Sequence, residues 1–103
     1  MSREQTARGA HRSGASCSAS VYNAFLDLNP HPGSIPAPRS EGGQCGAVLS
    51  ACKALREMGA DDAAFRQRFL ERFGSLKCGE LRRSRVPCND LVGAAARIME
   101  EML

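Results

Sequence analysis

A chain of 103 residues with a net charge of +3 is long enough for one small domain, and its fourteen basic and eleven acidic residues are nearly balanced. This balance, with only one tyrosine and four phenylalanines available for stacking on bases, argues against nucleic acid as a partner. Residues 1–16, MSREQTARGAHRSGAS, have no apolar core, so they predict neither a signal peptide nor a membrane span. We therefore expect a cytoplasmic protein without membrane insertion, in a compartment where thiols stay reduced.

The N-terminal part of the chain predicts an irregular segment followed by a helix. Residues 1–15 predict a disordered tail, and residues 16–103 predict a cysteine-rich helical domain. A first helix begins with a serine N-cap, Ser16 or Ser18, and ends near Leu28, because apolar residues recur there at helical spacing.

The rest of the chain predicts further helices after a loop. Residues 29–43, NPHPGSIPAPRSEGG, contain four of the five prolines and predict a Pro-rich loop. Helical periodicity then covers residues 44–58, 61–73 and 78–83, and a final helix begins at Pro87. The apolar positions expected to face the core on the helix at 61–73 are Phe65, Phe69, Leu70 and Phe73. We predict an all-α fold, a small bundle of about four helices with the Pro-rich loop after the first helix.

Four of the five cysteines fall at predicted helix starts. Cys17, Cys45 and Cys88 lie in the first turn of a helix, in register with its apolar stripe, and Cys78 opens the short helix. The unpaired N–H groups and the dipole of a helix start favour an anion, which for these residues is a thiolate. In this arrangement the four thiols can converge at one end of the bundle, although their spacing along the sequence does not require it.

Two other residues have plainer interpretations. Cys52 lies seven residues after Cys45, on nearly the same face and about 10 Å further along the helix. We expect a small buried hydrophobe there, with disulfide exchange with Cys45 as the alternative. His31, in the Pro-rich loop, is expected to be an ordinary loop residue or a ligand at the rim of the cysteine site. Because the chain has no Cys-x-x-Cys pair, zinc ribbons, ferredoxin runs and thioredoxin-like motifs are not indicated.

The order of the cysteines nevertheless resembles a known pattern. The matching pieces are CSASV at 17–21, GQCGAV at 43–48, CGEL at 78–81 and CNDLV at 88–92. Over roughly residues 16–103 the chain resembles the redox-active family named after its own pattern, C_GCAxxG_C_C. It departs from that pattern near Ser50, where a glycine is usual, and in the Pro-rich loop that replaces a glycine-rich approach to the second cysteine.

The resemblance implies a small, largely helical protein that transfers electrons or binds a metal or iron–sulfur centre. The chain is also similar to the cysteine-rich helical part of split-Soret cytochromes, where an iron–sulfur cluster is the implied occupant. Carried over to this chain, the family's four cofactor-binding or metal-binding cysteines are Cys17, Cys45, Cys78 and Cys88. A haem function does not carry over, because the chain has no Cys-x-x-Cys-His attachment site.

Three functions are open at this point. The first is electron transfer through an iron–sulfur cluster held by the four cysteines, which implies a redox partner protein. The second is a structural zinc site with the same four ligands. The third is a metal-free protein that cycles between thiols and disulfides, for example with Cys78 paired to Cys88.

Overall fold

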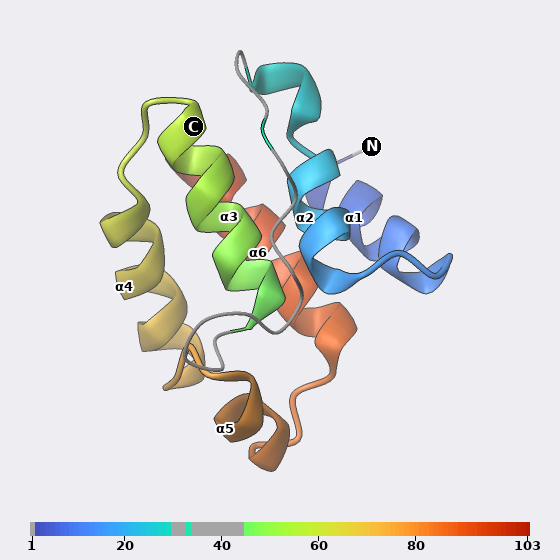
Figure 1. Cartoon of the computed structure of the whole chain (residues 1–103). Coiled ribbons are helices and arrows are strands. Elements are labelled where there is room, and N and C mark those ends of the chain that lie inside the picture. The colour runs from blue at the N-terminus through green and yellow to red at the C-terminus, as the bar shows by residue number, and fades with distance from the viewer. Residues whose placement is uncertain (1, 30–32, 34–44) are drawn as a thin grey trace.

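Capping residues and glycines mark several of the helix boundaries in the structure, a computed structural model that describes residues 2–29, 33 and 45–103. The elements in chain order are α1 (Arg3–Arg12), α2 (Cys17–Asn23), the 3-10 helix η1 (Leu26–Leu28), α3 (Gly46–Glu57), α4 (Asp62–Phe73), α5 (Cys78–Arg83) and α6 (Cys88–Met102). Figure 1 shows α3, α4 and α6 packed side by side, with α1 and α2 against another side of α6. The described residues contain no β-strand, which confirms the all-α fold class.

Helix α4 shows how local signals set the boundaries. Asp61 is its N-cap, and the carboxylate accepts a hydrogen bond from the N–H of Ala63 at 3.0 Å. At the other end Gly74 has a φ of 77°, a left-handed conformation that glycine adopts without strain. Phe65 and Phe69 are fully buried, as the periodicity predicts.

Two leucines at apolar positions of the predicted helices lie at the surface. Leu70 is 40% exposed, because it lies about 100° around α4 from Phe69 and outside the buried stripe. Leu28 is 46% exposed, because the predicted first helix is divided into α2 and η1. At the division the N–H of Phe25 donates to the carbonyl of Tyr22 at 3.2 Å, an i to i−3 bond that tightens the chain.

The structure differs from the expectation of a disordered N-terminal tail. Residues Arg3–Arg12 form α1, which begins with a capping box and lies along α6 (Figure 1). Ala7 is buried in the core, and Arg8 forms an ion pair with Asp90 at 3.0 Å. The periodicity did not reveal this helix because it contributes a small alanine and charged groups to the contact instead of large apolar side chains.

The predicted loop and helix count are not confirmed. The loop falls mainly on residues 30–32 and 34–43, which lie outside the described residues. The count of about four helices is not confirmed because α1 also packs against the bundle.

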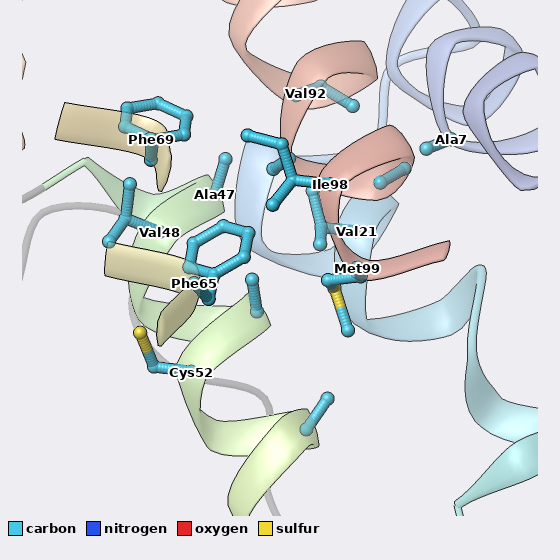
Figure 2. Packing of buried hydrophobic residues seen from close by; sticks show 14 of the residues in the cluster. Ala7, Val21, Ala47, Val48, Cys52, Phe65, Phe69, Val92, Ile98 and Met99 are labelled. Carbon is cyan, nitrogen blue, oxygen red and sulfur yellow. The ribbon is translucent and has the colours of Figure 1, made fainter. Parts of the chain in front are cut away.

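Helix α6 forms the centre of the core. All six residues of Leu91–Ala96 are buried, so nearly two turns face other parts of the protein on every side. Helices α1, α2, α3 and α4 all pack against α6. Figure 2 shows the result: Val21 from α2 and Phe65 from α4 lie in one cluster with Ile98 and Met99. The helices that carry the cysteines are therefore held around a common core.

Candidate thiol site

The structure places four cysteines at helix starts. Cys17, Cys78 and Cys88 are the first residues of α2, α5 and α6, and Cys45 is the N-cap of α3. In Figure 1, α3 and α6 begin at the lower end of the molecule, where α5 also lies. The sequence therefore predicted correctly that Cys17, Cys78 and Cys88 open helices, whereas Cys45 lies one residue before α3 instead of inside its first turn.

Two hydrogen bonds connect three of these helix starts. The hydroxyl of Ser18, the residue after Cys17, donates to the carbonyl oxygen of Gly46 at 3.2 Å. Gly46 directly follows Cys45, whose own N–H donates to the carbonyl oxygen of Leu76 at 2.9 Å. Leu76 lies two residues before α5. The backbone at the starts of α2, α3 and α5 therefore forms one hydrogen-bonded neighbourhood.

The start of α6 is attached to α1. Asn89, the residue after Cys88, donates from its side-chain amide to the carbonyl oxygen of Arg8 at 3.1 Å. The same amide lies 3.2 Å from the Nδ1 atom of His11. Because α1 leads directly into α2, these contacts connect the start of α6 to the segment before Cys17.

The cysteines differ in their access to solvent. Cys88 is exposed, Cys17 is half-buried, and Cys45 is only 4% exposed. The side chain of Cys78 lies outside the described residues, as does all of His31. Reagents in solution therefore reach Cys88 most directly and Cys17 next, whereas Cys45 is largely shielded from solvent.

The described side chains do not present a complete metal site. A tetrahedral thiolate centre needs four ligands within bonding distance of one ion. Among the described histidine, cysteine, aspartate and glutamate side chains, no three lie close enough together to hold a metal ion. Cys17, Cys45 and Cys88 belong to this set, so the three do not fit a preformed centre.

Cys52 lies in the core, separate from the helix starts. Its side chain is fully buried on α3 (Figure 2), and its Sγ atom accepts a hydrogen bond from Nε of Arg66 at 3.3 Å. Burial raises the pKa of the Cys52 thiol, and the hydrogen bond from Arg66 opposes only part of that rise. Since the thiolate is the reactive form, this environment suits an inert core residue.

The sequence pattern gave no sign of a hydrogen-bonded cluster at the C-terminal end of α3, which we call the Glu57 clasp (Glu57, Tyr22, Asn29 and Gly33). One carboxylate oxygen accepts from the hydroxyl of Tyr22 at 2.5 Å and from the amide of Asn29 at 2.8 Å. The other accepts from the N–H of Gly33 at 3.0 Å and lies 3.6 Å from Nζ of Lys53. The sequence indicates only one of these contacts, the i,i+4 pair of Glu57 with Lys53.

The clasp shifts the pKa values of its two ionisable members in opposite directions. Burial alone would raise the pKa of Glu57, but the hydrogen bonds from Tyr22, Asn29 and Gly33 and the charge of Lys53 together outweigh burial and lower it. Burial raises the pKa of Tyr22, and the hydrogen bond to the Glu57 carboxylate, a smaller effect, raises it further. At neutral pH the clasp therefore consists of a carboxylate and a neutral phenol.

Comparisons with known proteins give no relative for this chain. Neither the protein-family models nor the curated proteins nor the solved structures contain a match to it. Among the described helices, none combines the length and the apolar character needed to cross a membrane.

Proposed function

We propose that this chain is a redox-active thiol protein in which Cys17 and Cys45 form the first reversible disulfide. The observation that supports this pairing is the hydrogen bond from Ser18 to the carbonyl oxygen of Gly46, at 3.2 Å. These two residues directly follow the two cysteines, so the hydrogen bond holds the start of α2 against the start of α3. The resemblance of the four cysteine pieces to a redox-active family supports the same chemistry.

The proposed reaction is thiol–disulfide exchange with the disulfide of a redox partner protein in the cytoplasm. The thiolate of Cys17, the more accessible of the pair, attacks one sulfur of the partner's disulfide, and one partner thiolate leaves. The thiolate of Cys45 then attacks the Cys17 sulfur of the mixed disulfide and releases the second partner thiolate. The two cysteines lose two electrons and two protons, and the partner's disulfide becomes two thiols. Cys78 and Cys88 form the second pair in this proposal.

A redox titration tests the pairing. The protein is equilibrated anaerobically in dithiothreitol buffers of increasing oxidised fraction, its remaining thiols are alkylated, and its peptides are mapped by mass spectrometry. We expect Cys17 joined to Cys45 and Cys52 reduced throughout. The Cys52→Ala variant is the matched control, and its titration should superimpose on that of the natural chain. A chain that forms no intramolecular disulfide at any potential would contradict the thiol-exchange proposal.

A metal centre on the same four cysteines is the second candidate function. The family resemblance and the hydrogen-bonded helix starts support it, but Cys17, Cys45 and Cys88 would have to move together when the metal binds. In that case an iron–sulfur cluster supplies one-electron chemistry, whereas zinc supplies a structural cross-link. Anaerobically purified protein that is brown and contains iron and sulfide supports the cluster, and colourless protein with one zinc per chain supports the zinc site.

Serine substitutions separate a shared centre from independent cysteines. If the four cysteines ligate one ion or cluster, replacing any of them with serine should remove most of the metal. A Cys45→Ser, Cys88→Ser double variant should then lose little more than either single variant, because one missing ligand already disrupts the centre. Independent, additive losses of stability with unchanged metal content would contradict a shared centre.

A further inference from the structure

Helix α1 is attached to the rest of the molecule mainly by polar contacts. Of its ten residues, all of which the structure describes, Ala7 alone is fully buried. Near its N-terminus Arg3 pairs with Asp27 at 2.6 Å, and the Arg3 N–H donates to a carboxylate oxygen of Glu100 at 3.1 Å. One turn further along, Arg8 reaches the start of α6 through its guanidinium group.

The contact at Arg8 depends on a glycine in α6. A Cβ atom at Gly93 would overlap the guanidinium of Arg8, so the arginine lies across the helix where a side chain is missing. From this position Arg8 reaches Asp90 at 3.0 Å and Asn89 at 3.2 Å. The side of α6 that faces α1 is therefore formed by Asn89, Gly93 and, two turns further on, Glu100.

Contacts of this kind are sensitive to ionic strength. Exposed ion pairs are screened by salt, with a Debye length that falls from about 10 Å at 0.1 M to about 3 Å at 1 M. A helix of ten residues is too short to persist in water by itself, so α1 should unwind when it leaves α6. We propose that α1 is a salt-sensitive strap that detaches and unwinds as one unit while the other helices stay folded.

Detachment of the strap has a consequence for the thiols. Residues 13–16 connect α1 directly to Cys17, and Asn89, beside Cys88, is held by α1. Opening the strap therefore loosens the starts of α2 and α6 together and increases the access of reagents to the half-buried Cys17. This regulatory role rests on the proposed function, whereas the detachment of α1 does not.

Hydrogen exchange of the full-length chain tests the strap. Exchange rates in α1 are measured by mass spectrometry at 0.05 M and 1 M NaCl and divided by those of an unstructured peptide with the sequence of residues 2–14. We expect about three- to tenfold faster exchange across α1 at high salt, with α4 and the C-terminal half of α6 unchanged.

Three variants test the attachment of α1 by changing its residues instead of relying on the salt concentration alone. Arg8→Gln should accelerate exchange in α1 at low salt and reduce its response to NaCl. Arg97→Gln, which removes an exposed pair with Glu101 within α6, is the matched control and should change nothing in α1. Gly9→Ala should slow exchange in α1 about fivefold through higher helix propensity. Apart from the neighbouring residues and the backbone of α1 itself, no described atom lies within 4 Å of the added Cβ.

The same samples test the coupling to the thiols. Peptide-resolved alkylation with iodoacetamide should label Cys17 faster in Arg8→Gln and more slowly in Gly9→Ala, with Cys52 protected in both. Exchange in α1 as slow as in α6 at both salt concentrations, or equal acceleration in every helix, would overturn the strap. If hydrogen exchange in α1 changes in the variants but the rate of Cys17 alkylation does not, the proposed coupling between α1 and Cys17 is wrong. If the redox titration yields no disulfide while α1 responds, the proposed function fails and the strap stands.

Discussion

Replacing Glu57 with glutamine tests how strongly the Glu57 clasp stabilises the domain. In the structure one carboxylate oxygen accepts hydrogen bonds from the Tyr22 hydroxyl and the Asn29 amide, and the other accepts one from the N–H of Gly33. Glutamine presents an NH₂ group in place of one oxygen, so in either orientation of the amide at least one donor faces another donor. A hydrogen bond to a charged group contributes about 1.5–3 kcal/mol. We therefore expect Glu57→Gln to lower the free energy of unfolding by about 2 kcal/mol at pH 7.

Urea denaturation followed by circular dichroism measures this loss, and its pH dependence identifies the cause. The pKa of Glu57 is lowered in the folded protein. Its contribution is therefore complete above the ordinary carboxyl pKa and is lost as the pH falls through the lower folded value. The difference between the natural chain and Glu57→Gln should narrow over that acidic range.

A matched control and a clear negative result complete the test. Glu101→Gln also removes an i,i+4 charge partner, but its side chain is 57% exposed, so we expect a change below about 0.5 kcal/mol. If Glu57→Gln were as mild as this control at pH 7, or if its effect did not depend on pH, the clasp would not be a stabilising element.

Three further substitutions have expected outcomes that the same denaturation assay measures. Cys52→Ala should lower stability by about 1 kcal/mol or slightly more and leave disulfide formation and metal content unchanged; a change in either would move Cys52 into the site. Phe69→Ala should lower the free energy of unfolding by about 3–5 kcal/mol because the ring is fully buried. The neighbouring Leu70→Ala should lower it far less, and equal losses for the two variants would contradict the observed buried face of α4. Gly74→Ala should lower the free energy of unfolding by about 1 kcal/mol because an alanine is strained at a φ of 77°. An unchanged urea midpoint would contradict this, because the backbone would then have relaxed to accept the alanine.

The sequence predicted best those parts of the fold that depend on local interactions. Asp61 and Gly74 bound α4 because a cap and a left-handed glycine act within one turn of the helix. Helix α1 escaped prediction because its docking depends on Arg8 and Asp90, which are 82 residues apart in the chain. Such a pair has no periodicity that a sequence pattern can reveal.

The same distinction applies to the candidate site. The first-turn positions of Cys17 and Cys88 follow from two local signals, the capping serine Ser16 and the helix-starting Pro87, and the structure has them there. Whether thiols on different helices approach one another depends on how the helices cross, and this is a tertiary property. The contact from Ser18 to Gly46 and the hydrogen bonds that Glu57 accepts from Tyr22, Asn29 and Gly33 are of the same kind. Each joins residues at least 24 positions apart through one or two side-chain atoms.

The buried run Leu91–Ala96 determines how the sequence of this protein can change over time. Four helices pack against α6 and every residue of this run is buried, so an added methyl group there meets other protein atoms before it meets solvent. Overpacking a core costs about 1–3 kcal/mol, a large share of the roughly 5–15 kcal/mol that stabilises a typical domain. Changes in this run should therefore arise in pairs, with a gain of volume in α6 offset by a loss in a neighbouring helix. Drift by single substitutions should instead concentrate on outward positions such as Leu70 and Arg97, where volume is unconstrained.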